Sequence, residues 1–211
     1  KKRLNTIAPY NLVKTMRAGV LVLGPLLAKF KKAKVSLPGG CAIGSRPVDL
    51  HLFALKKMGA KIKIKNGYIY ASAKNGLIGA KINFPKISVG ATENAIIAAA
   101  HAKGKTTLWN CSIEPEVQDL IFFLNNLGCN IRLKKRNIVI VGMFEPKIIS
   151  YEIMFDRIEA GTYLIASALA GKKISILKVK PSVIDTEIKI LKKMGVKITT
   201  KKNKIIIHKS N

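Results

Sequence analysis

Three segments of one pattern recur along the 211-residue chain, and this internal repeat restricts the possible folds more than any other sequence feature. The segments read LKKMGAKIKI at 55–64, LNNLGCNIRL at 124–133 and LKKMGVKITT at 191–200. Each pattern is typical of a helix end, a glycine that can take a left-handed cap conformation, and a strand with alternating side chains. Because the copies lie 69 and 67 residues apart, the sequence predicts three consecutive structural repeats.

The same order of elements is predicted in every repeat. Apolar helices rich in small residues are expected at 11–30, 92–102 and 158–170, followed by short strands at 34–37, 106–109 and 173–177. A turn containing proline leads into an amphipathic helix, which we expect at 49–58, 116–127 and 182–194. Two strands close each repeat, at 61–64 and 68–71, 130–133 and 138–141, and 197–200 and 204–208. The Asn66-Gly67 pair between the first two of these strands is typical of a tight hairpin turn.

Each repeat therefore reads strand–helix–strand–helix–strand–strand, a βαβαββ unit. The first helix of each unit is too apolar to face water, as the run IASALA at 165–170 illustrates. We therefore predict an α/β (α+β) fold in which three units, at about 1–75, 76–145 and 146–211, form one pseudo-threefold domain with helices inside and sheets outside. The βαβ parts predict parallel strands and the final strand pairs predict hairpins.

The charge of the chain is unusual. Lys and Arg number 38 against 11 Asp and Glu, which gives a formal charge of +27. Such an excess first suggests an anionic partner such as nucleic acid. However, 32 of the 38 are lysines spread along the chain, and Ile is also abundant at 29 residues. Arginine is the residue favoured for bidentate phosphate and base recognition, so we favour compositional bias, and a functional polyanion surface stays as the alternative.

Three cysteines, Cys41, Cys111 and Cys129, form no CxxC pair and show no zinc-ligand spacing. Reduced thiols in a cytosolic protein are the simplest interpretation. The longest apolar run, at 18–28, has 11 residues and is too short to span a bilayer. No signal peptide is visible, and the first residue is Lys1, so we expect a processed end or an internal cut.

The segment PGGCAIGSRPVDLH at 38–51 carries the strongest chemical signal. Its three glycines within seven residues describe a flexible loop, which ends at a predicted helix start where anions are favoured. Cys41 lies in this loop near Arg46, and both the arginine and the helix dipole favour a reactive thiolate. A buried cysteine in an ordinary turn is the alternative.

The same segment resembles the cysteine-loop signature of the UDP-N-acetylglucosamine enolpyruvyl transferase family. Further stretches are similar to this family in order and spacing: APYNLVKTMRAG at 8–19, LGPLLAKF at 23–30, KISVGATEN at 86–94, EPEVQDL at 114–120 and DRIEAGTYLIA at 156–166. The resemblance covers essentially the whole chain. It implies the inside-out barrel type of fold that enolpyruvyl transferases have, which agrees with the repeat pattern. The shikimate-pathway enolpyruvyl transferases share that fold but resemble these motifs less well.

The resemblance implies a transferase that moves the enolpyruvyl group of phosphoenolpyruvate to the 3-hydroxyl of UDP-N-acetylglucosamine, the first committed step of peptidoglycan synthesis. By this resemblance Cys41 is the proton donor to phosphoenolpyruvate and the residue that fosfomycin alkylates. The same resemblance makes His51 a residue that orients the loop. The residues implied to bind substrate are Arg17, Arg46, Pro47, Val48, Asp49, Leu50, Lys86, Ile87, Ser88 and Val89. No cofactor and no metal are implied.

Family enzymes have two similar domains with the active site between them, and this chain accounts for about one. It lacks the family's Lys-Asn motif, which binds phosphoenolpyruvate, and the second domain with its general base. We therefore expect the cysteine-loop domain of a longer enzyme, which does not turn over alone and needs the missing domain as its partner. A cytoplasmic location, with neither nucleic acid nor a membrane as partner, is the matching expectation.

Other polar residues have ordinary explanations beside the functional ones. Glu114 and Glu116 are a carboxylate pair, but acidic residues before a helix are good N-terminal electrostatics, which we favour. Asp156 fits a helix N-cap or a cleft residue equally well. His101 and His208 are interpreted as structural or solvated. Two rival functions are a basic nucleic-acid-binding repeat domain, which the 13 scattered aromatic residues do not favour, and a non-catalytic remnant.

Overall fold

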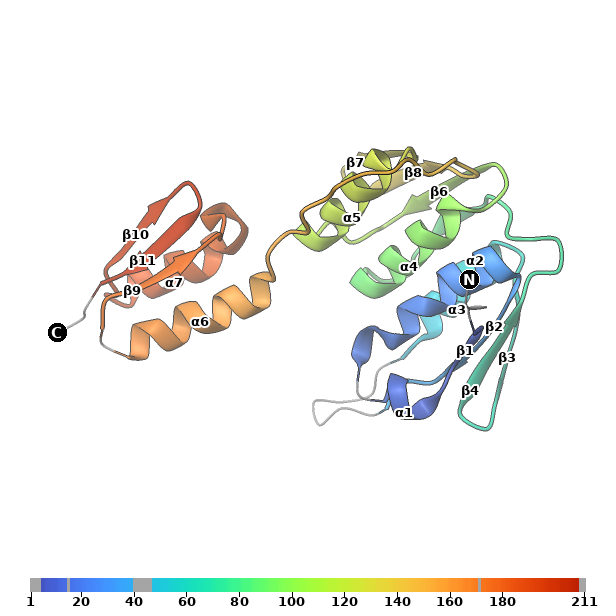
Figure 1. Cartoon of the computed structure of the whole chain (residues 1–211), viewed down its shortest axis with the longest axis horizontal. Coiled ribbons are helices and arrows are strands. Elements are labelled where there is room, and N and C mark those ends of the chain that lie inside the picture. Colours follow the sequence, from blue (N-terminus) through green and yellow to red (C-terminus); the bar gives the residue numbers. More distant parts are fainter. Residues whose placement is uncertain (1–4, 15, 40–46, 171, 209–211) are drawn as a thin grey trace. The chain divides into compact units, whose positions relative to one another are not determined.

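The chain divides into two compact units, Lys1–Tyr151 and Glu152–Asn211. The computed structural model describes residues 5–14, 16–39, 47–170 and 172–208, apart from the side chain of Arg17. The first unit holds the first two predicted repeats and the start of the third, and the second unit holds the rest of the third (Figure 1). Each unit has its own hydrophobic core. The assignment of all three repeats to one domain, with boundaries at about 1–75, 76–145 and 146–211, stays a prediction.

The first repeat folds into a four-stranded sheet with its helices on one side. Its elements are β1 (Ile7–Ala8), α1 (Tyr10–Val13), the 3-10 helix η1 (Arg17–Val22), α2 (Leu23–Phe30), β2 (Lys32–Ser36), α3 (Asp49–Lys57), β3 (Lys61–Lys65) and β4 (Tyr68–Ser72). The strand order is β1-β2-β4-β3, with β1 parallel to β2 and the other pairs antiparallel. Asn66 and Gly67 both have positive φ angles, 49° and 70°, which confirms the predicted hairpin turn.

The predicted single helix over 11–30 is wrong. The structure has the short helix α1, then η1, and only then the regular helix α2. Pro25 explains where α2 begins, because it is the third residue of that helix. A proline is tolerated in the first helical turn, where the backbone N–H groups have no intrahelical acceptor, but it interrupts a helix that has already started.

The second repeat has the topology of the first. Its elements are β5 (Lys81–Asn83), α4 (Val89–Ala100), β6 (Lys105–Trp109), α5 (Pro115–Asn126), β7 (Asn130–Lys134) and β8 (Asn137–Val141). The strand order is β5-β6-β8-β7, and β5 runs parallel to β6. This identity of topology confirms for the first two repeats what the recurring sequence pattern predicted.

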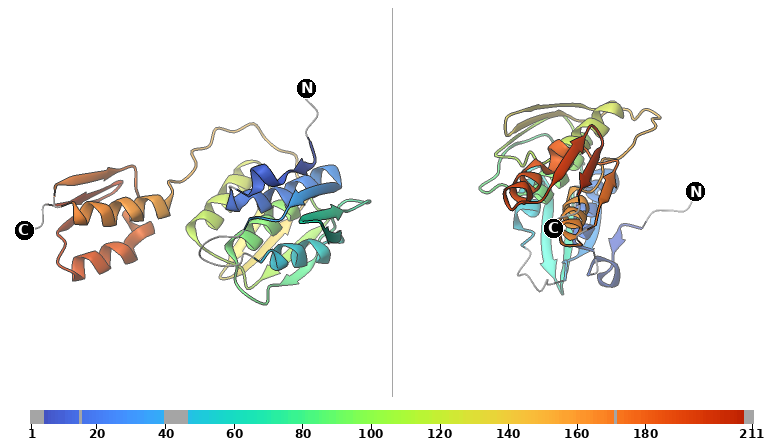
Figure 2. Two further views of the ribbon diagram at one scale, coloured as in Figure 1. Left: turned by 90° about the horizontal axis from the view of Figure 1, so that it is seen from below. Right: turned by 90° about the vertical axis from the view of Figure 1, so that its left-hand side faces the viewer.

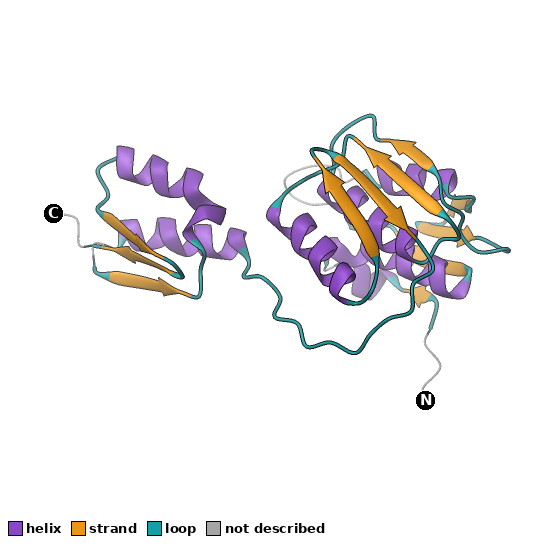
Figure 3. Cartoon of the chain, turned by 90° about the horizontal axis from the view of Figure 1, so that it is seen from above, coloured by secondary structure: helices purple, strands orange, loops and turns teal. Residues whose placement is uncertain are grey.

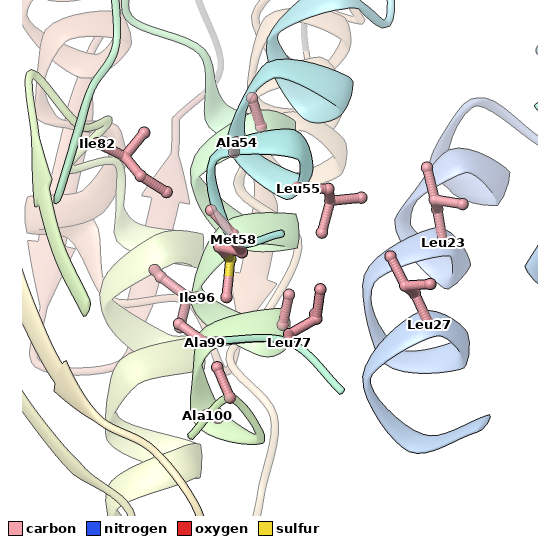
Figure 4. Packing of buried hydrophobic residues seen from close by; sticks show 14 of the residues in the cluster. Leu23, Leu27, Ala54, Leu55, Met58, Leu77, Ile82, Ile96, Ala99 and Ala100 are labelled. Atoms are coloured by element: carbon pink, nitrogen blue, oxygen red, sulfur yellow. The ribbon is translucent and has the colours of Figure 1, made fainter. Parts of the chain in front are cut away.

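Helices α2 to α5 lie between the two sheets of the first unit (Figures 1 and 3). Helix α4 is the central one and packs against α2, α3, α5 and strand β8. In the core, Leu23 and Leu27 of α2 and Leu55 and Met58 from the α3 segment lie near α4, which contributes Ile96 (Figure 4). Within this unit the prediction of buried helices inside outer sheets is therefore confirmed.

The second unit is a smaller version of the same design. It contains α6 (Arg157–Leu169), β9 (Ile174–Leu177), the 3-10 helix η2 (Pro181–Ile184), α7 (Asp185–Lys193), β10 (Ile198–Lys201) and β11 (Lys204–Ile207). The strands form an antiparallel sheet in the order β10-β11-β9. Both helices lie on one face of this sheet (Figure 2), where Leu164, Ile188, Ile205 and Ile207 form its core.

The third repeat departs from the predicted βαβαββ order, because no strand precedes α6 in the described residues 142–156. Tyr151, which lies in this segment, contacts helix α5 of the first unit. The hydroxyl of Tyr151 donates to Asp119 Oδ1 of α5 at 2.8 Å, and its ring contacts Phe122 and Phe123. Tyr151 is thereby anchored to the first unit and does not form a first strand beside β9.

Candidate active site

The predicted substrate-binding residues 47–50 lie at the start of helix α3. Pro47 is exposed, Val48 occupies the N-cap position, and Asp49 and Leu50 form the first turn. The apolar side chain of Val48 makes no capping hydrogen bond at this helix start. The first N–H groups of a helix have no intrahelical acceptor, and such groups favour anionic ligands. The binding roles of these four residues stay predictions.

The predicted residues 86–89 lie at the start of helix α4. Lys86 and Ile87 are exposed. The side chain of Ser88 accepts a hydrogen bond from the Ala91 N–H at 3.3 Å and is the N-cap of the helix. Val89 is the first helical residue, so α4 begins three residues earlier than the sequence predicted. The hydroxyl of Ser88 thus has a structural partner, and its predicted role in binding substrate stays a prediction.

The remaining predicted residues are placed only in part. Arg17 is the first residue of η1, and its side chain lies outside the description. Cys41 and Arg46 lie outside the described residues, so the predicted chemistry of the loop thiol stays a prediction. The described start of the loop is close to the end of α1, since a Cβ atom on Gly39 would lie 3.4 Å from the carbonyl oxygen of Lys14.

The buried carboxamide of Asn94 connects the three segments that begin with predicted site residues. Asn94 of α4 accepts a hydrogen bond from the Gly24 N–H of α2 at 2.9 Å. Its amide nitrogen lies 3.4 Å from the Val20 carbonyl oxygen of η1 and 3.0 Å from Nδ1 of His51 in α3. The segments that start at Arg17, at Pro47 and at Lys86 are therefore joined by side-chain hydrogen bonds in the core of the first unit.

Two glycines allow these helices to approach each other. A Cβ atom on Gly24 would lie 2.1 Å from Asn94 Oδ1, which no side chain could accommodate without a shift. A Cβ atom on Gly90, in the first turn of α4, would lie 3.2 Å from Cε1 of His51. The imidazole therefore packs closely on the start of α4, and glycine at these positions permits that close contact.

Burial determines the electrostatics around this network. It lowers the pKa of His51 from its ordinary 6.5 to about 4, and the nearby Asp49 carboxylate opposes this only in part. Burial also raises the pKa of Glu93 in α4, and the charge of Glu116 adds to this. The buried environment therefore favours the neutral forms of both side chains.

Cys111 and Cys129 are poor candidates for a reactive thiol. Burial raises the pKa of Cys111 to about 12 and that of Cys129 to about 11. The thiolate is the nucleophilic form, so these two side chains are chemically inert near neutral pH. Of the three cysteines, Cys41 remains the one for which the sequence predicts reactivity.

Two of the carboxylates that the sequence singled out, Glu116 and Asp156, lie at helix starts, whereas Glu114 Oε2 is buried without a hydrogen-bond partner among the described residues. Pro115 opens α5 and Glu116 lies in its first turn, as the electrostatic interpretation of this segment predicted. Asp156 is the N-cap of α6, and its Oδ1 accepts hydrogen bonds from the N–H groups of Ile158 at 2.8 Å and Glu159 at 3.1 Å. Of the two interpretations of Asp156, the N-cap is the one the structure shows.

A basic hollow lies on the first sheet, lined by residues of β2, β3 and β4. Lys32, Lys34, Lys61 and Lys63 surround the exposed Tyr70 there. The ammonium group of Lys34 lies 4.6 Å from the ring centre of Tyr68 and 5.3 Å from that of Tyr70. Both tyrosine rings therefore make cation–π contacts with Lys34.

Among the described residues, no group of three or more His, Cys, Asp or Glu side chains could hold a metal ion. Over the same part of the chain, every helix is too short or too polar to cross a lipid bilayer.

The sequence did not single out Asn94 or Gly24, although both lie in stretches that resemble the family. A possible signal was the composition of α4, where Asn94 interrupts a helix made mostly of Ala and Ile. A buried amide in such a helix needs hydrogen-bond partners, but the sequence alone does not show which residues supply them.

Comparison with known proteins agrees with the resemblance seen in the sequence. The sequence profile of EPSP synthase (3-phosphoshikimate 1-carboxyvinyltransferase) matches residues 2–211. A UDP-N-acetylglucosamine 1-carboxyvinyltransferase of Pelagibacter ubique is 64% identical over 210 residues, which are 99% of this chain and 50% of that protein. One from Vesicomyosocius okutanii is 53% identical over 207 residues, 98% of this chain and 49% of that protein. The chain spans about half the length of these relatives.

Solved structures support the fold. The enolpyruvyl transferase NikO from Streptomyces tendae aligns with a TM-score of 0.80 at 20% identity, covering 97% of this chain and 49% of NikO. An EPSP synthase from Acinetobacter baumannii aligns with a TM-score of 0.69 at 18% identity, covering 90% of this chain and 46% of that one. The profile that matches residues 2–211 shows that the chain belongs to the EPSP synthase family of enolpyruvyl (carboxyvinyl) transferases.

Proposed function

We propose that this chain is the cysteine-loop domain of a UDP-N-acetylglucosamine 1-carboxyvinyltransferase. The observation that carries the proposal is the 64% identity to a protein of that name over 99% of the chain. The reaction joins phosphoenolpyruvate and UDP-N-acetylglucosamine and releases inorganic phosphate. Because the chain spans about half of its relatives, we propose that the complete site also needs a second, similar domain.

The chemistry requires a proton donor beside phosphoenolpyruvate. In the addition step the sugar 3-hydroxyl bonds to C2 of phosphoenolpyruvate and loses its proton to a base, while C3 receives a proton from the Cys41 thiol. In the elimination step C3 loses a proton and the phosphate leaves with the electron pair of its C–O bond. The predicted role of Cys41 in this sequence is general acid catalysis.

The sugar nucleotide would be held by residues at the helix starts. Pro47 to Leu50 open α3 and Lys86 to Val89 lead into α4, and Asn94 links these two helices. Helix starts present backbone N–H groups that suit a diphosphate, and Arg17 and Arg46 would add charge. The proposal also includes a role in peptidoglycan synthesis, inhibition by fosfomycin and a cytoplasmic location, all of which rest on the family resemblance.

Labelling with fosfomycin tests this proposal. We expect one covalent adduct at Cys41, formed faster in the presence of UDP-N-acetylglucosamine, and no adduct in the Cys41→Ser variant. A Cys129→Ser variant is the matched control and should be labelled like the wild type. Equal labelling of the wild type and Cys41→Ser would refute the assignment of the thiol.

Phosphate release tests the need for a second domain. The isolated chain should release no phosphate from phosphoenolpyruvate and UDP-N-acetylglucosamine above the rate without enzyme. Robust turnover by the isolated chain would show that a second domain is not required. Binding to duplex DNA with a steep salt dependence would instead favour the rival function as a nucleic-acid-binding module.

A further inference from the structure

Asn94 is a buried amide whose oxygen and both N–H groups have hydrogen-bond partners. Its side chain is 1% exposed in the middle of the apolar helix α4. A carboxamide offers one acceptor oxygen and two N–H donors. The oxygen accepts from the Gly24 N–H, and the amide nitrogen serves the Val20 carbonyl oxygen and Nδ1 of His51. Such a satisfied network holds its members in one arrangement.

Asn94 and two of its partners, Val20 and His51, come from the three segments that carry predicted substrate-binding residues. Val20 belongs to η1, the 3-10 helix that begins at Arg17. His51 directly follows Leu50 in the first turn of α3. Asn94 itself lies in the second turn of α4, one and a half turns after the Ser88 cap.

We propose that Asn94 and His51 are a positioning pair that fixes the starts of η1, α3 and α4 relative to one another so that they bind one sugar nucleotide together. The identity of the ligand, a sugar nucleotide, rests on the proposed function. The positioning role of the two residues rests on the hydrogen bonds of Asn94. Neither residue needs to touch the ligand. The pair acts through the segments that it joins.

The geometry also assigns the tautomer of His51. The Gly24 N–H fixes which end of the carboxamide is oxygen, because the NH₂ end cannot accept that hydrogen bond. The NH₂ group therefore faces His51, and Nδ1 must be the acceptor. The imidazole proton then resides on Nε2. An acceptor at the Nδ1 position is the property on which the pair depends.

The need for an acceptor at the Nδ1 position predicts different outcomes for two substitutions of His51. Asparagine places its Oδ1 near the position of Nδ1 and keeps an acceptor for the Asn94 amide. Leucine fills the space but leaves one buried N–H of Asn94 without a hydrogen-bond partner, which is unfavourable in the core. The matched control is Leu55→Ala, which creates a cavity in the same helix without altering the network.

Three measurements on the full chain test the pair. The first is the ¹⁵N spectrum of the His51 imidazole in the wild type at neutral pH. The second is hydrogen exchange of backbone amides, compared among His51→Asn, His51→Leu, Asn94→Leu and Leu55→Ala under conditions of equal global stability. The third is the Kd for UDP-N-acetylglucosamine, measured by titration of backbone amide resonances.

We expect the Nε2–H tautomer in the wild type. In His51→Leu and Asn94→Leu, exchange should accelerate at Gly24 and at the starts of α3 and α4 more than in Leu55→Ala, and binding should weaken about tenfold. His51→Asn should stay within about threefold of the wild-type Kd. A merely structural role would accelerate exchange throughout the unit and would not distinguish the two His51 variants.

The Nδ1–H tautomer in the wild type would overturn the pair even if no variant folded. Equal exchange patterns in Asn94→Leu and Leu55→Ala, or equal losses in His51→Asn and His51→Leu, would also overturn it. If the wild-type chain does not bind UDP-N-acetylglucosamine, the proposed ligand fails for the isolated chain. The tautomer and the exchange pattern still decide whether the pair exists.

Discussion

The stability of the Lys1–Tyr151 unit should depend on the protonation of His51. This side chain is 8% exposed, and its burial lowers its pKa from 6.5 to about 4, against the opposing charge of Asp49. In the unfolded chain His51 takes up a proton near pH 6.5, whereas the folded unit resists protonation until about pH 4. Between these values the unfolded state binds more protons, so stability is lost as the pH falls.

The expected size of this loss follows from the difference between the two pKa values. One pKa unit corresponds to about 1.4 kcal/mol, so a pKa that falls from 6.5 to about 4 is worth about 3 kcal/mol. This contribution is complete above pH 6.5 and absent below about pH 4. It is large beside a typical domain stability of about 5–15 kcal/mol.

Urea unfolding followed by tryptophan fluorescence measures this effect. Trp109 is the only tryptophan of the sequence and lies in β6, so its emission reports on the first unit. We compare the wild type with His51→Asn at about pH 7 and about pH 4. The difference in unfolding free energy between the two proteins should change by about 3 kcal/mol over this range, because the other titrating groups are common to both.

A control variant is His208→Asn, which removes a histidine of the second unit and should leave the fluorescence transition unchanged. If the wild type and His51→Asn lost stability in parallel as the pH fell, His51 would not be a buried neutral histidine. The hydrogen bond from Asn94 to Nδ1 would then be wrong as well.

Three further predictions concern single side chains. Asn125→Ala should lower the stability of the first unit by about 1–3 kcal/mol in urea unfolding, because Asn125 bonds both backbone polar groups of one β7 residue at 2.8 and 2.9 Å. The neighbouring Asn126 is its control, with an expected effect of about 0.5 kcal/mol or less, because its hydrogen bond to the Phe122 carbonyl oxygen is exposed to solvent. Asp156→Ala should cost about 1 kcal/mol and accelerate amide exchange in the first turn of α6, and unchanged exchange there would contradict the N-cap. Iodoacetamide near neutral pH should modify Cys41 and spare the buried Cys111 in a peptide-mapping experiment, and modification of Cys111 in the folded chain would contradict its raised pKa.

The sequence alone determined the repeat and most of the elements. Helix α5, predicted at 116–127, lies at Pro115–Asn126, and the strands that follow each repeated glycine are present. The hairpin at Asn66-Gly67 also formed as predicted. Such features are set by neighbours in the chain, through side-chain period and turn residues, so local sequence is sufficient to predict them.

The sequence was less informative where a neighbouring element decides the outcome. The helix predicted over 11–30 breaks into three pieces, for which only Pro25 is a local signal, and the third repeat has no first strand in its described part, where Tyr151 is instead bonded to Asp119 of α5. The motifs at 8–19, 38–51 and 86–94 indicated a substrate site, but nothing in them showed that Asn94 joins the segments they begin. Hydrogen bonds between residues 43 and 74 positions apart depend on how the helices pack, and helix packing is settled only in the tertiary structure.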